Sequence, residues 1–198
     1  MKLLLLSDKP NPVFWDFYRP GRLDSYDLIL SAGDLDPEYL TFLVTMSHAP
    51  VLYIHGNHDA SYDARPPEGC ECIDDRLIQY RGLRIVGLGG SALYNNGPYQ
   101  YTERQMRQRI RRLNGKVRRA KGVDLVLTHA APHGYCDDSD YAHRGFEAFL
   151  PMLDRWNPKA LVHGHIHLMY GIPREQRYRE TRILNAYESV ELDMDVHI

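Results

Sequence analysis

Short apolar runs that end in acidic, amide or imidazole side chains recur along the first third of the chain. Continuous apolar runs of this length, bounded by turn residues, are typical of strands that are buried on both faces. We therefore predict three buried strands that deliver polar side chains at their carboxyl ends. They are residues 2–7 before Asp8, residues 27–31 before Gly33-Asp34, and residues 51–54 before Gly56-Asn57-His58-Asp59.

Three other segments carry apolar residues at the spacing of an amphipathic helix. Asn114-Gly115 falls inside the helix predicted to begin after Thr102, so that helix is either continuous or interrupted there. The predicted helices are one opened by Pro37 and ended by Pro50, one capped by Thr102 with inward positions Met106, Ile110, Leu113 and Val117, and one over residues 145–156.

The remaining apolar segments predict further strands, of which two form a hairpin around Arg81-Gly82. Strand and helix alternate early and the tail is rich in strands, without an internal repeat or a break in composition. This order predicts one α/β domain over residues 1–198, with a mixed sheet or two sheets. The additional strands are residues 77–80, 83–87, 124–128 before His129, 160–163 before Gly164-His165-Ile166-His167, and alternating segments near 177–184 and 190–196.

Composition limits the class of protein. The chain has 198 residues, of which 43% are hydrophobic and 25% charged, and 24 Lys and Arg oppose 26 Asp and Glu. A formal charge of −2 gives the whole molecule no net attraction to nucleic acid or to an anionic membrane. The apolar runs are too short for a membrane span or a signal peptide, and the three cysteines cannot all pair, so we expect a cytoplasmic protein.

Side chains of types that can ligate a metal stand at five predicted strand-to-loop junctions. Such residues gather at the carboxyl ends of strands in α/β folds, so we expect them to converge on one crevice. Carboxylate, amide and imidazole groups without clustered thiolates suit Mn, Fe or Zn in a catalytic centre. Asp34 is the candidate that bridges two cations. The junctions carry Asp8, Asp34, Asn57 with His58, His129, and His165 with His167.

The order and spelling of these motifs resemble the calcineurin-like metallophosphoesterase family. The resemblance implies a four-layer α/β/β/α sandwich, in which two mixed sheets are flanked by helices, and a centre of two divalent ions, with Mn expected and Fe or Zn as alternatives. It further implies that His58 contacts the phosphoryl group and is a candidate general acid. It assigns one ion to Asp8, Asp34 and His167, and the other to Asp34, Asn57, His129 and His165.

One departure from the family pattern concerns the first ion. The family usually spells its first motif Asp-x-His, whereas this chain has Asp8-Lys9-Pro10. The first ion therefore lacks one imidazole, and we expect it to bind more weakly than the second. The usual partner that orients His58 is also missing, and Asp36 is a candidate for that role.

These features predict a metal-dependent hydrolase of phosphoesters, in which two cations generate a hydroxide for in-line attack on phosphorus. A phosphodiester is slightly favoured over a phosphomonoester, because small members of the family without added caps resemble phosphodiesterases. The expected substrate is a phosphorylated small molecule or a nucleotide. The alternative is a non-catalytic metal-binding scaffold of the same fold, although the presence of His58 argues against it.

Other features have simpler interpretations. We interpret His55, Cys70 and Cys72 as structural, with support of a neighbouring metal ligand left open for His55. The isolated histidines His48, His133, His143, His163 and His197 are interpreted as structural too. Residues 104–121 hold nine Lys or Arg, which favours the solvated face of a helix over a nucleic-acid groove, with both left open. Three nearby tyrosines either stack a base or form a loop lid: Tyr94, Tyr99 and Tyr101.

Overall fold

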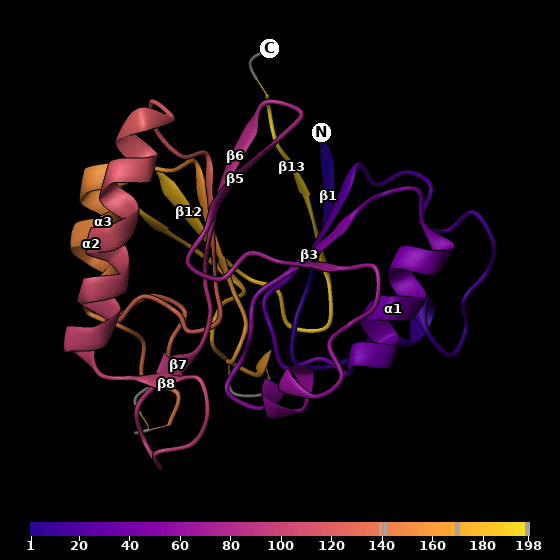
Figure 1. Ribbon diagram of the computed structural model, residues 1–198, viewed down its shortest axis with the longest axis horizontal. Coiled ribbons are helices and arrows are strands. Elements are labelled where there is room, and N and C mark those ends of the chain that lie inside the picture. Colours follow the sequence, from indigo (N-terminus) through magenta and orange to yellow (C-terminus); the bar gives the residue numbers. More distant parts are fainter. Residues whose placement is uncertain (139, 141, 169–170, 197–198) are drawn as a thin grey trace.

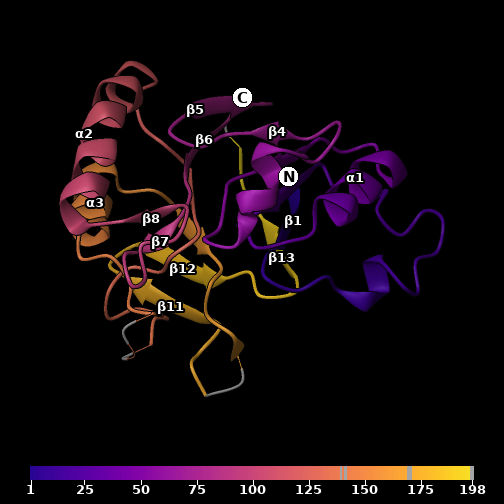
Figure 2. The same ribbon diagram turned by 60° about the horizontal axis from the view of Figure 1, so that its bottom comes forward.

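The fold has four layers (Figure 1). A computed structural model describes residues 1–138, 140, 142–168 and 171–196. Two sheets lie face to face, with α1 (Pro37–Met46) outside one and both α2 (Glu103–Arg119) and α3 (Phe149–Trp156) outside the other, as Figures 1 and 2 show. This arrangement confirms the predicted α/β/β/α sandwich. No helix in the described part of the chain is long and apolar enough to span a membrane.

The first sheet contains the three strands predicted from the start of the chain. Its order is β13-β1-β2-β3-β4, in which β1 to β4 run parallel and β13 is antiparallel to β1. The carboxyl ends of β1, β2 and β3 therefore lie at one edge of this sheet. The bounds are β1 Lys2–Leu6, β2 Leu28–Ser31, β3 Val51–Tyr53, β4 Glu71–Cys72 and β13 Val190–Asp193.

The second sheet is also mixed, with the order β11-β12-β10-β9-β6-β5. Its four central strands are parallel, and β11 and β5 are antiparallel edges. Two short strands, β7 and β8, pair apart from it. The bounds are β5 Leu77–Tyr80, β6 Leu83–Leu88, β7 Ser91–Ala92, β8 Gln100–Tyr101, β9 Leu125–Thr128, β10 Ala160–His163, β11 Glu175–Tyr178 and β12 Thr181–Asn185.

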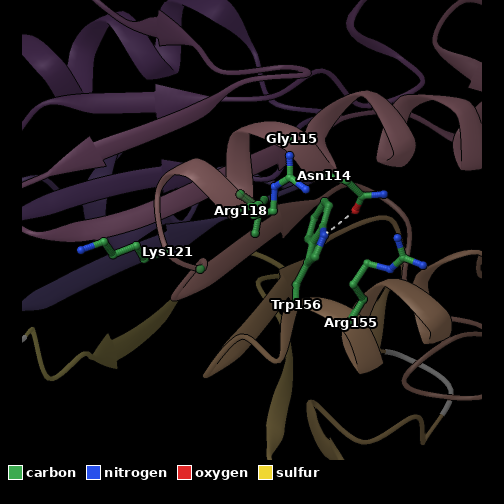
Figure 3. Close-up of a pocket in the computed structure, with 8 residues that line it drawn as sticks. Asn114, Gly115, Arg118, Lys121, Arg155 and Trp156 are labelled. Carbon is green, nitrogen blue, oxygen red and sulfur yellow. Dashed lines mark hydrogen bonds between the residues drawn. The ribbon is translucent and has the colours of Figure 1, made fainter.

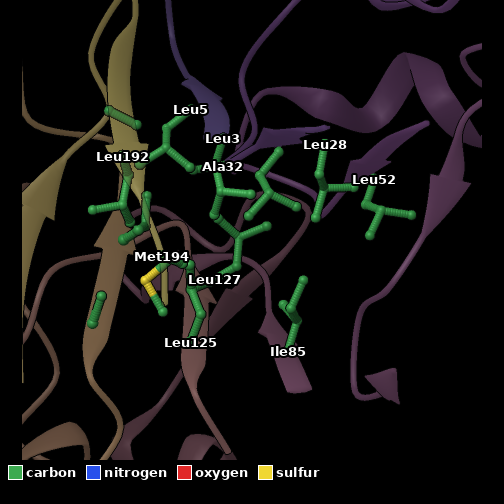
Figure 4. Packing of buried hydrophobic residues seen from close by; sticks show 14 of the residues in the cluster. Leu3, Leu5, Leu28, Ala32, Leu52, Ile85, Leu125, Leu127, Leu192 and Met194 are labelled. Atoms are coloured by element: carbon green, nitrogen blue, oxygen red, sulfur yellow. The ribbon is translucent and has the colours of Figure 1, made fainter. Parts of the chain in front are cut away.

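Strand β1 is apolar from Leu3 to Leu6 because both faces of the sheet are covered at this strand. Leu3 and Leu5 of β1 pack between the sheets, where they meet residues such as Leu127 of β9 (Figure 4). The alternate residues Leu4 and Leu6 face the α1 side of the sheet. A strand whose successive side chains point to opposite faces must be apolar at every position when both faces are buried.

Helix α2 shows the predicted cap and the predicted apolar stripe. The Thr102 hydroxyl accepts from the Gln105 amide, and the Gln105 side chain accepts from the Thr102 amide, which forms a capping box. The helix continues through Asn114 and Gly115, which resolves the open question in favour of a continuous helix. Asn114 is held there because its Oδ1 accepts from Trp156 Nε1 at 2.8 Å.

Two helix boundaries differ from the prediction. Helix α1 ends at Met46 rather than at Pro50, because the backbone is already extended at Ser47, whose hydroxyl donates to the Ala49 carbonyl. Helix α3 begins at Phe149 rather than at residue 145, because Phe146 pairs with Pro132 in an isolated bridge. These local contacts have no signature in the hydrophobic spacing.

Candidate metal centre

The predicted metal ligands stand on loops at the edge where both sheets end. Asp8 follows β1, Asp34 follows β2 and His165 follows β10, and all three adopt positive φ values of 64°, 57° and 66°. Left-handed backbone is uncommon in residues other than glycine and is often associated with functional sites. His129 directly follows β9, and Asn57 lies in the loop after β3.

Glycines in these motifs allow the loops to approach one another closely. A Cβ atom on Gly56 would lie 2.0 Å from Asp34 Oδ1, and one on Gly33 would lie 2.3 Å from the Gly56 nitrogen. A Cβ on Gly164 would lie 2.6 Å from the Cβ of Ser7, beside Asp8. The absence of side chains at these positions therefore brings the ligand-bearing loops into contact.

Four of the six predicted metal ligands converge at this edge. The ligand atoms of Asp34, His129 and His165 all lie within 4.8 Å of one another. His129 Nε2 lies 2.9 Å from Asn57 Oδ1 and 3.4 Å from Asp34 Oδ2. His129 and His165 are buried, so the cluster is largely shielded from solvent.

Backbone carbonyls orient the two imidazoles. His129 Nδ1 lies 2.7 Å from the Ala32 carbonyl, and His165 Nε2 lies 2.9 Å from the Ala142 carbonyl. Donation to a carbonyl fixes the proton on that nitrogen, which leaves His129 Nε2 and His165 Nδ1 as the available ligands. Burial lowers the pKa of His165 to about 3, so this imidazole is neutral and able to ligate at neutral pH.

Electrostatics at Asp34 and His129 fit the presence of a cation. Burial alone would lower the pKa of His129, but the charge and hydrogen bond of Asp34, together with Asp8 and the Ala32 carbonyl, outweigh it and raise the pKa to about 9. Burial would likewise raise the pKa of Asp34, but His129 and the His58 amide hold it at about 2. Oxygens from Asp34 and Asn57 thus face His129 Nε2. A divalent cation bound between these three atoms would take the place of the proton that they share without a metal.

Asp59, whose role the sequence did not reveal, ties two of the loops together. Its Oδ2 accepts from the Asp34 amide at 2.8 Å and from the Gly56 amide at 2.7 Å. Asp34 Oδ1 in turn accepts from the His58 amide at 2.8 Å. Burial, followed by the nearby Asp34 charge, raises the pKa of Asp59 to about 6.

The other two predicted ligands stand at the margin of this cluster. Both carboxylate oxygens of Asp8 accept from the His165 amide, at 3.1 and 2.9 Å, and burial raises the pKa of Asp8. His167 is exposed, and its ring lies 4.9 Å from that of Tyr187. The assignment of the first ion to Asp8, Asp34 and His167 stays a prediction.

His58 and its expected partner do not meet. The side chain of His58 is exposed, whereas Asp36 interacts with Glu38. An imidazole with a bound carboxylate occurs instead at His143, whose Nδ1 lies 2.6 Å from Asp140 Oδ2. The His143 ring lies 5.0 Å from that of His165. We interpreted His143 as an isolated residue because no motif surrounds it in the sequence; His197, treated likewise, lies outside the described residues.

The tyrosine-rich loop packs against the site as a lid. The Tyr94 hydroxyl accepts from Asn57 Nδ2 at 3.0 Å, and the Tyr99 ring stacks on His55 at 4.3 Å. Tyr101 contacts the guanidinium of Arg109 at 4.2 Å. Since Tyr99 and Tyr101 already have ring partners, this geometry favours the lid over base stacking.

His55 belongs to a second group of candidate ligands next to that lid. Ligand atoms of His55, Cys72 and Asp74 lie within 4.8 Å of one another. His55 Nδ1 lies 2.6 Å from Asp74 Oδ2; although burial would lower the pKa of His55, the interactions with Asp74 and Cys72 raise it to about 10. A protonated imidazole paired with a carboxylate is a structural ion pair, in agreement with the structural interpretation of His55.

A model of the family described as calcineurin-like phosphoesterase matches residues 9–169. The chain therefore belongs to that family. No curated protein sequence matches the chain.

Solved structures share the fold at low sequence identity. One superposes with a TM-score of 0.71 at 13% identity, covering 97% of this chain and 94% of the other. TT1561 of Thermus thermophilus gives 0.57 at 12% identity, covering 94% and 89%. GAP50, described as the anchor in the inner membrane complex of Plasmodium, gives 0.55 at 13% identity, covering 93% and 70%. At these identities the likeness establishes the fold alone.

Proposed function

We propose that this protein is a metal-dependent hydrolase of phosphoesters. The observation that carries the proposal is the convergence of the Asp34, His129 and His165 ligand atoms within 4.8 Å, where the strands of both sheets end. Membership of the calcineurin-like phosphoesterase family supports the same activity. The donor set of carboxylate, amide and imidazole suits Mn, Fe or Zn.

Each residue of the site has a distinct proposed role. Asp34, Asn57, His129 and His165 hold one divalent cation, and Asp8 and His167 with Asp34 hold a second, weaker one. When bound, the cations supply Lewis acidity for a phosphoryl group and for water. The exposed His58 imidazole hydrogen-bonds a phosphoryl oxygen and donates a proton to the leaving oxygen, while its amide fixes Asp34 Oδ1.

The surroundings of the site support a small phosphodiester substrate, such as a nucleotide diester. A cavity of about 420 Å³, lined by Asp138, Asp140, His143, Ile166 and His167, adjoins the cluster and has the size of a small-molecule site. A diester carries one negative charge and a monoester carries up to two. Carboxylates in this lining, of which Asp140 is paired with His143, repel the monoester more strongly than the diester.

Hydrolysis assays on metal-depleted protein resupplied with Mn test the proposal. We expect faster cleavage of bis(4-nitrophenyl) phosphate than of 4-nitrophenyl phosphate. Asp34→Asn should abolish this activity and reduce the metal content, whereas the matched change of exposed Asp16 to Asn should alter neither. Bound metal without hydrolysis of either ester would favour the alternative of a metal-binding scaffold.

A further inference from the structure

The exposed face of α2 carries a row of arginines that the proposed hydrolase does not use. Arg104, Arg111 and Arg118 are all exposed and stand seven residues apart. Seven residues are almost two full turns, so these side chains share one side of the helix at intervals of about 10.5 Å. The buried side of α2, which includes Met106 and Leu113, lies opposite.

This row lacks carboxylates to balance it. Glu103 is the only acidic residue of the helix, and it pairs with Arg107 at the first turn. Among the described residues, no ion pair forms with Arg104, Arg111 or Arg118. The three therefore remain available to an anionic partner.

Like charges also stand next to one another on the helix surface. Arg107 and Arg111 are four residues apart, and so are Arg112 and Lys116. Like-charge pairs at this spacing destabilise a helix by about 0.2–0.5 kcal/mol each. Charges of alternating sign are typical of an exposed helix that salt bridges stabilise, and α2 lacks that pattern. The arrangement on α2 costs stability in isolation, and an anionic partner would relieve that cost.

Two separate hollows lie along the same helix, and each is lined in part by basic side chains. Near the start of α2, a cavity of about 310 Å³ is lined by Arg104, Arg107, Gln108 and Arg111. Near its end, a cavity of about 590 Å³ lies between α2 and α3 and is lined by eight residues that include Gly115, Arg118, Lys121 and Arg155. In the view of Figure 3, the Trp156 indole lies between the side chains of Arg118 and Arg155.

The rim of the larger cavity is held in place. Arg84 forms an ion pair with Asp124 at 2.8 Å and donates to the Ala120 and Lys121 carbonyls. Gly115, with nothing within 4 Å of an added Cβ, leaves the helix surface open beside Arg118. The cavity is thus accessible, and its basic side chains project from a fixed backbone.

We propose that the cationic face of α2, with Arg155 of α3, binds the phosphodiester backbone of nucleic acid without selecting its bases. Arginine dominates the surface, and its planar guanidinium matches phosphate oxygens better than an ammonium does. A row over the length of α2, about 25 Å at 1.5 Å per residue, suits an extended polyanion rather than one small anion. An anionic membrane fits less well, because the apolar side of α2 is buried in the protein.

A labelled single-stranded RNA of 20 nucleotides, titrated into EDTA-treated protein at several salt concentrations, tests this surface. Omitting metal separates binding from the proposed hydrolysis, so either idea can fail without the other. We compare the wild type with a variant carrying Arg104→Gln, Arg111→Gln and Arg118→Gln. Glutamine keeps a high helix propensity, and circular dichroism would verify that α2 is retained.

The matched control removes the same charge elsewhere, through Arg19→Gln, Arg65→Gln and Arg177→Gln at exposed positions outside α2 and α3. We expect the α2 variant to lose about tenfold or more in affinity at 100 mM salt and its log–log salt slope to fall by roughly 2, while the control changes little. Equal losses in both variants, absence of RNA binding by the wild type, or equal binding of polyglutamate or anionic vesicles would overturn the proposal.

Discussion

Gly56→Ala is expected to damage the metal centre without altering any ligand. The added Cβ would stand 2.0 Å from Asp34 Oδ1, whereas an ordinary contact is 3.4 Å or longer, so the carboxylate must shift by about 1.4 Å. Gly56 is not among the glycines with positive φ, so its backbone conformation is open to alanine and the effect is purely steric. Asp34 Oδ1 accepts from the His58 amide at 2.8 Å, so the shift also disturbs this hydrogen bond.

The magnitude follows from the contacts that are disturbed. Overpacking of this kind costs about 1–3 kcal/mol of folding free energy. A displaced carboxylate should also weaken metal binding by at least tenfold, which corresponds to about 1.4 kcal/mol. The matched control is Gly115→Ala, where nothing lies within 4 Å of the new Cβ and the helix gains about 0.5–1 kcal/mol.

Calorimetric titration of the metal-free variants with Mn, together with urea unfolding, measures both effects. We expect opposite changes in stability for the two glycine variants and a loss of Mn affinity at Gly56 alone. If Gly56→Ala bound Mn as tightly as the wild type, close contact between the loops after β2 and β3 would not be a requirement of the site.

Three further predictions concern catalysis, the core and pH. The His58→Ala variant should keep its metal, since this imidazole is not a predicted ligand, but its turnover should fall about a hundredfold. His48→Ala is the control at another exposed histidine, and loss of metal from His58→Ala would make His58 a ligand. Phe149→Ala should cost about 3–5 kcal/mol in urea unfolding because Phe149 is fully buried; a loss under 1 kcal/mol would contradict this. Burial would raise the pKa of Asp124, but Arg84 lowers it below its ordinary value. The pair therefore stabilises the fold above the unfolded pKa of about 3.9, and that contribution is lost as pH falls through the folded pKa. Asp124→Asn should thus lower stability more at pH 7 than at pH 2, and an equal loss at both would refute it.

The hydrophobic pattern was sufficient to predict most strands and helices, but it did not predict which strands pair with one another. A run such as Leu3 to Leu6 identifies a strand buried on both faces, because no solvent-facing position interrupts it. Nothing in the tail shows that β13 joins the first sheet beside β1 while β12 joins the second beside β10. Such pairings depend on long-range packing, for which one sequence carries no local signal.

The candidate metal centre was likewise predictable only in part. Strand ends predicted that Asp34, Asn57, His129 and His165 would converge, because the carboxyl ends of neighbouring parallel strands meet at one edge. The positive φ of Asp34 and the contact of Asn57 with Tyr94 were beyond prediction. Both arise from contacts between loops that are far apart in the sequence, and neither the spacing of residues nor the composition predicts such contacts.

Contacts between loops also explain why one arginine of α2 is buried whereas most of the others are exposed. Arg109 is buried, and it donates to the Gly89 carbonyl at 2.6 Å and to Asp75 at 2.8 Å. The next residue along the chain, Gly90, donates through its amide to the His55 carbonyl at 2.7 Å. His55 precedes the loop that carries Asn57, so Arg109 fastens α2 to the backbone that positions a predicted metal ligand. The helix that presents the cationic row is thereby fastened to the loop that carries part of the candidate centre, so a substitution at Arg109 would disturb both.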